Sequence, residues 1–123
     1  AETRLSLLLD YSNNLPALPE RLAEARDEGL GRVHECMTPV FLFLERDDGA
    51  VRLYADVAEE APTVKGFVSI LVNAYDGASP NDIAQCPDDL LQKLGLDGAI
   101  RMNRVVGLNA VLSRIKRETA ALS

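Results

Sequence analysis

Residues 39–57 of the chain read PVFLFLERDDGAVRLYADV. Two largely apolar stretches, Pro39 to Arg46 and Ala50 to Val57, flank Asp47-Asp48-Gly49, whose glycine can adopt the positive φ that closes a β-hairpin. Polar and apolar residues alternate in the second stretch, so one of its faces is expected to be solvated. The first stretch is apolar on both faces, which is typical of a central strand. We therefore predict an antiparallel hairpin, with a third strand within residues 31–36 beside it.

Helices are predicted before and after this hairpin. Apolar residues at helical spacing, prolines that suit a first turn and glycines that end helices indicate their positions. They are expected to begin near Leu5, Pro62, Ser79, Cys86 and Val105. Residues 20–28 are charged and rich in alanine, which fits either another short helix or an exposed connection. This order of elements predicts an α+β domain, in which a small antiparallel β-sheet of about three strands is covered by helices on one face.

Length and composition restrict the architecture and the partners. The chain is expected to form a single domain, residues 1–123, and 47% hydrophobic with 26% charged residues is ordinary globular composition. A net charge of -6 argues against nucleic acid, because phosphate binding needs concentrated Lys and Arg. The apolar runs are far shorter than the roughly 20 residues of a membrane helix, so no membrane is expected. With two cysteines and no secretory segment, we expect the cytoplasm or an organelle interior.

Cys36 is the residue to which the sequence first points for function. It lies between a segment containing Gly29 and Gly31 and the apolar strand that begins at Pro39. A thiol at the start of regular structure can be presented to another molecule, whereas a cysteine inside a periodic element usually fills space. On local context alone, a presented thiol and a small buried hydrophobe are both open interpretations.

Short motifs distributed along the chain help to choose between these two interpretations of Cys36. They are Leu15-Pro16-x-Leu18-Pro19, Val33-x-x-Cys36-x-Thr38-x-Val40-Phe41, Val64-Lys65-Gly66, Tyr75-x-Gly77-x-x-Pro80-x-x-Ile83, Leu94-Gly95-Leu96 and Arg104-x-x-Gly107-Leu108. In order and spacing they resemble the SufE family of sulfur-acceptor proteins in iron–sulfur cluster assembly. The resemblance extends from about Leu7 to Ile115.

The resemblance implies a specific function. A SufE-like protein, with the fold it shares with IscU-like scaffolds, takes a sulfur atom from the persulfide of a pyridoxal-phosphate cysteine desulfurase. It carries the sulfur on one cysteine, stimulates the desulfurase and delivers the sulfur to an iron–sulfur cluster scaffold. Cys36 matches the acceptor cysteine of the family. The implied protein is an accessory sulfurtransferase that acts only with its desulfurase, has no cofactor of its own, and is a monomer or weak homodimer.

Two further residues match family positions near the acceptor. Arg104 matches the arginine of the Arg-x-x-Gly motif, and Asp56 matches an acidic position at the end of the hairpin. The chain also departs from the family pattern, because Glu35 stands where a glycine usually precedes the acceptor and Thr38 where a serine usually follows it. Glu35 adds a negative charge beside the sulfur and removes the freest backbone position of the loop.

Sulfur transfer requires a thiolate that attacks the terminal sulfur of a persulfide, as in thiol–disulfide exchange. A free thiol is only partly ionised near neutral pH, so local activation of Cys36 is expected. His34 would lie on the same side as Cys36 in a strand-like stretch and could stabilise the thiolate. A solvated loop histidine is the alternative. Cys86, before Pro87 at a helix boundary, is interpreted as a structural residue.

Other classes of function are weighed against sulfur transfer. A metal-binding or cluster scaffold protein of similar fold would need several thiolate ligands, and the chain has two cysteines without a close-set pair. A cysteine hydrolase is disfavoured because the single histidine is only two residues from Cys36. A purely structural interaction domain remains as an alternative, in which replacing Cys36 would change only packing.

Overall fold

A computed structural model describes residues 6, 9–34, 36, 38–87, 90–93, 95 and 102–122 of the chain. Its central feature is the hairpin of β1 (Val40–Asp47) and β2 (Ala50–Val57), which pair in antiparallel register from Val40 opposite Val57 to Asp47 opposite Ala50. The two-residue turn between them places Asp48 at φ 50 and Gly49 at φ 85. Positive φ at both positions suits the right-handed twist of a tight hairpin. The hairpin expected from the sequence is therefore confirmed.

The prediction of a third strand is wrong. In the part of the chain that the structure describes, the sheet has two strands, and residues 31–33 contribute only an isolated bridge between Arg32 and Phe41. Leu42 N donates to the Gly31 carbonyl over 2.8 Å, and Val33 N donates to the Val40 carbonyl over 2.9 Å. The pairing stops there because a turn begins at His34. The predicted α+β class, with a small antiparallel sheet and helices, is confirmed.

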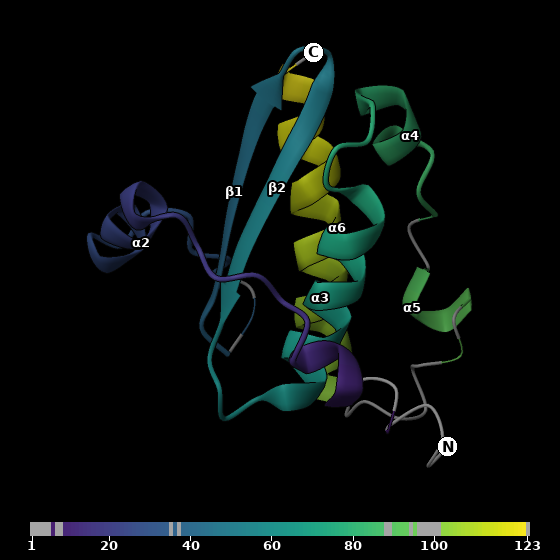
Figure 1. The fold of residues 1–123 in the computed structure, drawn as a ribbon. Coiled ribbons are helices and arrows are strands. Elements are labelled where there is room, and N and C mark those ends of the chain that lie inside the picture. The colour runs from purple at the N-terminus through teal and green to yellow at the C-terminus, as the bar shows by residue number, and fades with distance from the viewer. Residues whose placement is uncertain are drawn as a thin grey trace.

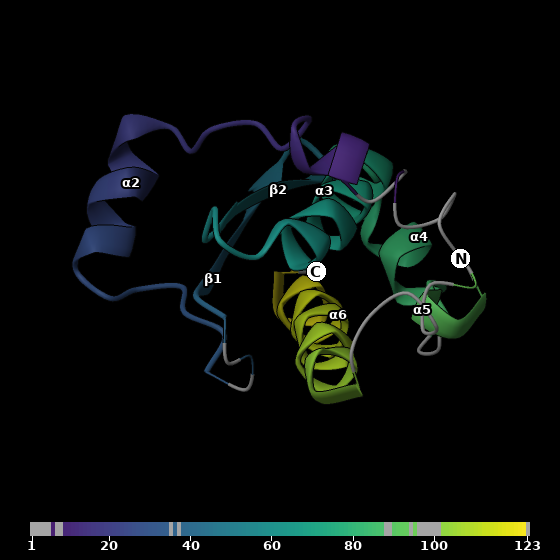
Figure 2. The ribbon, with the colours of Figure 1, turned by 90° about the horizontal axis from the view of Figure 1, so that it is seen from below.

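Two long helices cover the inner face of the hairpin. They are α3 (Pro62–Tyr75), which packs on β2, and α6 (Met102–Leu122), which packs on β1. The alternating burial of β2 directs Val51, Leu53 and Ala55 towards these helices. Buried apolar side chains from the hairpin, α3 and α6 form one continuous cluster, to which Cys36 belongs. The core therefore lies between the sheet and the α3–α6 layer (Figures 1 and 2).

The helix α2 (Glu20–Asp27) lies on the other side of the hairpin, as Figures 1 and 2 show. Of the two interpretations of residues 20–28, the short helix is therefore confirmed, and it ends at Asp27. Arg21 pairs with Glu45, and Nη1 of Arg26 lies 3.0 Å from Oδ2 of Asp56. The outer face of β2 carries Arg52, Tyr54 and Asp56, as predicted, whereas that of β1 carries Phe41 and Phe43. The helix α2 is joined to this outer face through its two arginines.

The remaining helices are short, and the first of the two begins where the sequence indicated. They are α4 (Pro80–Ala84) and α5 (Leu90–Lys93), and the N-cap of α4 is Ser79, whose Oγ accepts from Asp82 N over 3.1 Å. Residues 9–12 are helical, as expected for the first helix, whereas Leu5 and Leu8 lie outside the described residues. No helix in the described ranges combines the length and apolar character needed to cross a membrane.

Candidate functional site

Cys36 lies in a short loop whose two ends are fixed to the hairpin. At the first end, Val33 N donates to the Val40 carbonyl over 2.9 Å. At the second, Ala58 N donates to the Pro39 carbonyl over 3.1 Å, so the loop leaves and rejoins the sheet at defined points. Backbone hydrogen bonds therefore hold both ends of this segment to the hairpin. We call residues 34–38 the acceptor loop, after the role that the sequence predicts for Cys36.

Cys36 is folded inward from this loop into the core. Its residue is only 3% exposed, and its backbone N donates to the Val33 carbonyl over 3.2 Å. The backbone therefore makes a turn at this point and not the strand that the sequence suggested. Burial in an apolar cluster disfavours the charged form of a thiol and excludes bulk oxidants from it.

Cys36 packs against Gly107 of α6. A methyl group placed on Gly107 would lie 3.0 Å from both Cα and Sγ of Cys36, and 3.2 Å from its Cβ. Such separations are shorter than ordinary carbon–carbon or carbon–sulfur contacts, which begin near ~3.5 Å. A side chain at position 107 would therefore force Cys36 or α6 to shift by a few tenths of an ångström, and glycine allows the contact without that shift.

A second contact joins the same helix to the start of the loop. The guanidinium of Arg114 donates through Nη1 to the main-chain carbonyl of Arg32, and its Nε lies 3.3 Å from Oε2 of Glu118. Arg32 in turn lies over the ring of Phe41, with 5.8 Å between its Cζ atom and the ring centroid. The segment leading into the acceptor loop is thus held between β1 and α6.

The other predicted site residues are distributed around this loop. His34 is exposed, whereas Cys36 is buried. Asp56 lies on the outer face of the sheet, paired with Arg26 of α2. Arg104 belongs to α6, one turn before Gly107, and its side chain lies outside the described residues. Glu35, the unusual neighbour of the thiol, also lies outside them.

Cys86 occupies a separate part of the core. It is 3% exposed, and a hydrogen bond with it, together with burial, raises the pKa of the Tyr75 hydroxyl to about 12. Its main-chain carbonyl accepts a hydrogen bond from Nζ of Lys116 over 2.8 Å. These contacts agree with the structural role expected from the sequence. Within the described ranges, no group of three or more His, Cys, Asp or Glu residues is placed to hold a metal ion.

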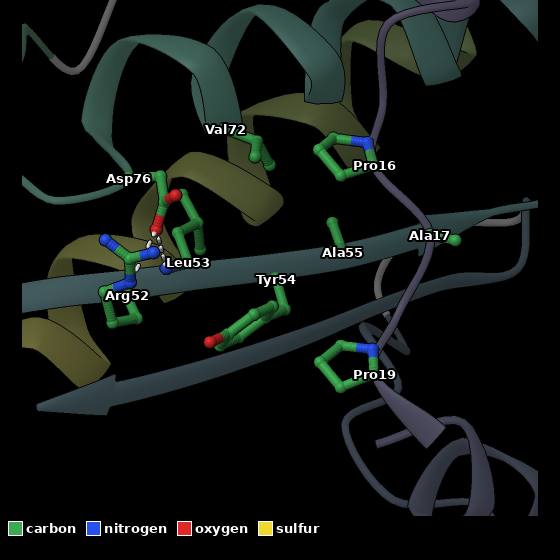
Figure 3. Close-up of a pocket in the computed structure, with 9 residues that line it drawn as sticks. All are labelled: Pro16, Ala17, Pro19, Arg52, Leu53, Tyr54, Ala55, Val72 and Asp76. Carbon is green, nitrogen blue, oxygen red and sulfur yellow. Dashed lines mark hydrogen bonds and ion pairs between the residues drawn. The ribbon is translucent and has the colours of Figure 1, made fainter. Parts of the chain in front are cut away.

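A groove lies beside β2, where residues 16–19 cross the strand (Figure 3). Asp76 closes one end of it, because its Oδ1 accepts from Leu53 N over 2.9 Å and lies 3.7 Å from Nε of Arg52. None of the predicted site residues lines this groove.

Comparison with known proteins decides the family. The family model SufE, described as an Fe-S metabolism associated domain, matches residues 1–119. The chain belongs to the SufE family. This membership confirms the resemblance carried by the motifs and supports a role in iron–sulfur metabolism.

Individual relatives agree with this assignment. An uncharacterized SufE-like protein of Mycobacterium tuberculosis is 43% identical over 117 residues, which cover 94% of this chain and 80% of that protein. The chloroplastic quinolinate synthase of Nicotiana tabacum is 29% identical over 122 residues, which cover 97% of this chain but 16% of that protein. The solution structure of a hypothetical protein from Thermus thermophilus superposes with a TM-score of 0.82 at 35% identity, covering 98% of this chain and 85% of that one. The SufE fold is therefore shared with a solved structure.

Sequence reasoning missed two residues at the site, Gly107 and Arg114. Gly107 was visible as part of the Arg-x-x-Gly motif, but no role was expected for it. The available signal was a glycine inside an amphipathic helix between Val105 and Leu108, where alanine would give a more stable helix. No pattern in the sequence pairs Arg114 with the carbonyl of Arg32, because backbone acceptors leave no trace in side-chain identity.

Proposed function

We propose that this SufE-family protein accepts a sulfur atom on Cys36 from the persulfide of a cysteine desulfurase and delivers it to an iron–sulfur cluster scaffold. One observation carries the proposal. The cysteine that matches the family acceptor lies in a loop tied to the sheet at both ends and is buried against α6. A cysteine with only a packing role would not need such a loop, since core cysteines commonly lie within helices or strands.

The proposed transfer is a thiol–persulfide exchange. The Cys36 thiolate attacks the terminal sulfur of the donor's cysteine persulfide, and a new S–S bond forms between Sγ and that sulfur. The S–S bond of the donor breaks, and its electron pair remains on the donor cysteine as a thiolate. The proton released by Cys36 balances the one that the donor thiolate takes up. No oxidant or reductant is consumed, so Cys36 needs no cofactor, and pyridoxal phosphate belongs to the donor.

The burial of Cys36 supports a carrier function. A persulfide exposed to solvent would be lost to oxidants or small thiols, whereas a 3% exposed position excludes them. The same burial prevents attack on a partner's persulfide, so Cys36 must leave the core for each transfer. The fixed points at Val33 and Pro39 confine that movement to the acceptor loop.

The supporting residues take roles that follow from their positions. His34 is exposed at the beginning of the loop and would face the desulfurase when Cys36 moves outward, where its imidazole can stabilise a thiolate. Asp56 acts at a distance, because its pair with Arg26 fixes the end of α2 just before the loop. Arg104 is placed by its helix near the loop-binding position at Gly107. The reducing cytoplasm is the compartment that suits two cysteines without a disulfide between them.

Mass spectrometry after incubation with a desulfurase and cysteine tests the proposal. The wild-type chain is expected to gain one sulfur atom that maps to Cys36 and that a reductant removes. Cys36→Ser should gain none and should not stimulate the desulfurase, whereas Cys86→Ser should behave as the wild type. Loading of sulfur on Cys86, or stimulation that survives Cys36→Ser, would show that the assigned acceptor is wrong.

A further inference from the structure

The contact between Cys36 and α6 depends on a residue that carries no chemistry. Gly107 is buried in the interior of α6, and a methyl group there would lie 3.0 Å from Cα and Sγ of Cys36. Glycine is a poor choice for a helix interior on grounds of helix propensity, and alanine would be better. A glycine that weakens the helix but admits another segment of the chain indicates that the close approach matters more than helix stability.

The same helix holds the beginning of the loop at a second point. The carbonyl of Arg32 accepts a hydrogen bond from Nη1 of Arg114, about two turns after Gly107. Residues two turns apart lie on the same face of a helix. One face of α6 therefore contacts the segment from Arg32 to Cys36 at both its ends.

We propose that Gly107 is a positioning residue for the acceptor cysteine. Because Gly107 has no side chain, Cys36 can pack against α6 at this point and rest there between transfers. The inference rests on the proposed function for its biological meaning, because it assigns to Gly107 the control of how often Cys36 is exposed to a partner. Gly107 itself does not touch the donor or the transferred sulfur. It sets the balance between the buried and the released states of the loop.

A methyl group at position 107 is expected to disfavour the buried state and leave the released state unaffected. The clash involves Cα of Cys36 as well as Sγ, so rotation of the cysteine side chain cannot relieve it. The backbone at Cys36 must therefore shift away from α6 by a few tenths of an ångström. Since the loop is anchored at Val33 and Pro39, this movement does not require the sheet to open.

The rate at which iodoacetamide alkylates each cysteine tests the inference, with mapping of both sites in one sample. Gly107→Ala should raise the alkylation rate of Cys36 about fivefold or more, the factor expected from overpacking at a buried contact. Cys86 is 3% exposed in a different part of the core and reports general unfolding in the same molecule. Its rate should stay unchanged, so the ratio of the two rates is the quantity measured.

Two controls make the result specific to position. Val106→Ala changes the neighbouring residue of α6, which is 66% exposed, and should leave the ratio as in the wild type. The pH profile separates exposure from acidity: greater exposure raises the rate by one factor at every pH, whereas a changed thiol pKa shifts the midpoint. An unchanged ratio in Gly107→Ala, or a shift of the midpoint alone, would overturn the positioning role.

A third variant covers the case in which Gly107→Ala fails to fold. Combining it with Cys36→Gly removes the contacts of the added methyl group with Sγ and Cβ and leaves only the contact with Cα, so the double variant is expected to recover part of the stability that Gly107→Ala loses, and recovery of none would also overturn the inference. None of these measurements uses a desulfurase or sulfur. If Cys36 gains no sulfur but the alkylation ratio rises, the proposed function fails and the positioning role stands. If sulfur loads on Cys36 while the ratio is unchanged, the proposed function stands and the positioning role fails.

Discussion

Arg114 in α6 donates a hydrogen bond through Nη1 to the main-chain carbonyl of Arg32, a residue 82 positions earlier in the chain. This bond connects the last helix to the segment that enters the acceptor loop. Gly107, about two turns earlier on the same helix, receives Cys36 at the middle of the loop. The site is thus built from one loop and one helix face, which are brought together by the hairpin between them.

Replacing Arg114 by methionine is expected to loosen the start of the acceptor loop. The carbonyl of Arg32 would lose a charged donor, which should lower the free energy of unfolding by about 1–3 kcal/mol. Cys36 should also become more reactive towards iodoacetamide. The matched control is Glu118→Gln, which removes the ion pair of Arg114 but keeps its bond to Arg32. If both variants accelerate alkylation of Cys36 equally, the bond to Arg32 does not hold the loop.

Two glycines with positive φ differ in their surroundings and allow a comparison. Gly49 (φ +85) has no atom within 4 Å of an added methyl group, whereas at Gly31 (φ +79) the methyl would lie 2.7 Å from Cζ of Phe43. Gly49→Ala should cost only the backbone strain, about 1–2 kcal/mol. Gly31→Ala should cost about 1–3 kcal/mol more, because the ring and strand must also move. Urea unfolding of both variants measures this difference, and equal costs would contradict the close packing at Gly31.

The core between the sheet and the long helices should tolerate truncation poorly. Ile115 of α6 is 1% exposed and belongs to the central cluster, so Ile115→Ala is expected to lower the free energy of unfolding by about 2–5 kcal/mol. Leu30 is 56% exposed, and Leu30→Ala should change it by less than about 0.5 kcal/mol. Chemical denaturation of the two variants checks the contrast. Similar losses of unfolding free energy in the two variants would mean that Ile115 contributes no more to the core than the exposed Leu30 does.

The elements of this fold could be predicted where local chemistry determines them. The turn at Asp48 and Gly49, the cap at Ser79 and the apolar spacing of α3 each act within a few residues, and each was correctly placed. The third strand was overestimated because β-propensity in residues 31–36 does not reveal where pairing stops. That limit is set by the turn that folds Cys36 away from β1 and towards α6.

The candidate site shows the same division between local and long-range information. Cys36 could be found because a sequence motif surrounds it, and its loop position follows from the residues beside it. The expected pairing with His34 rested on strand geometry, whereas the backbone turns at this point, and the pairing stays a prediction. The contribution of α6 could not be predicted, because it depends on a residue without a side chain and on a backbone carbonyl.

Tyr75 and Cys86 give the protein a specific response to alkaline pH. The hydrogen bond with Cys86, and then burial, raise the pKa of the Tyr75 hydroxyl from 10.0 to about 12. Above about pH 10 the unfolded chain therefore loses this proton before the folded protein does. Stability is unaffected by this group below about pH 10 and falls as the pH rises towards about 12.

The loss attributable to Tyr75 should reach about 1 kcal/mol near pH 11, since one pKa unit corresponds to about 1.4 kcal/mol. Tyr75→Phe removes the titrating group, so its urea midpoint should fall less than that of the wild type between about pH 9 and pH 11. Cys86→Ala removes the main cause of the shift and should lower the pKa of Tyr75, measured by the ultraviolet absorption of tyrosinate. An unchanged tyrosine titration in Cys86→Ala would show that burial alone, and not the thiol, raises the pKa. Because lysines titrate in the same range in all three proteins, only the differences between them report on Tyr75.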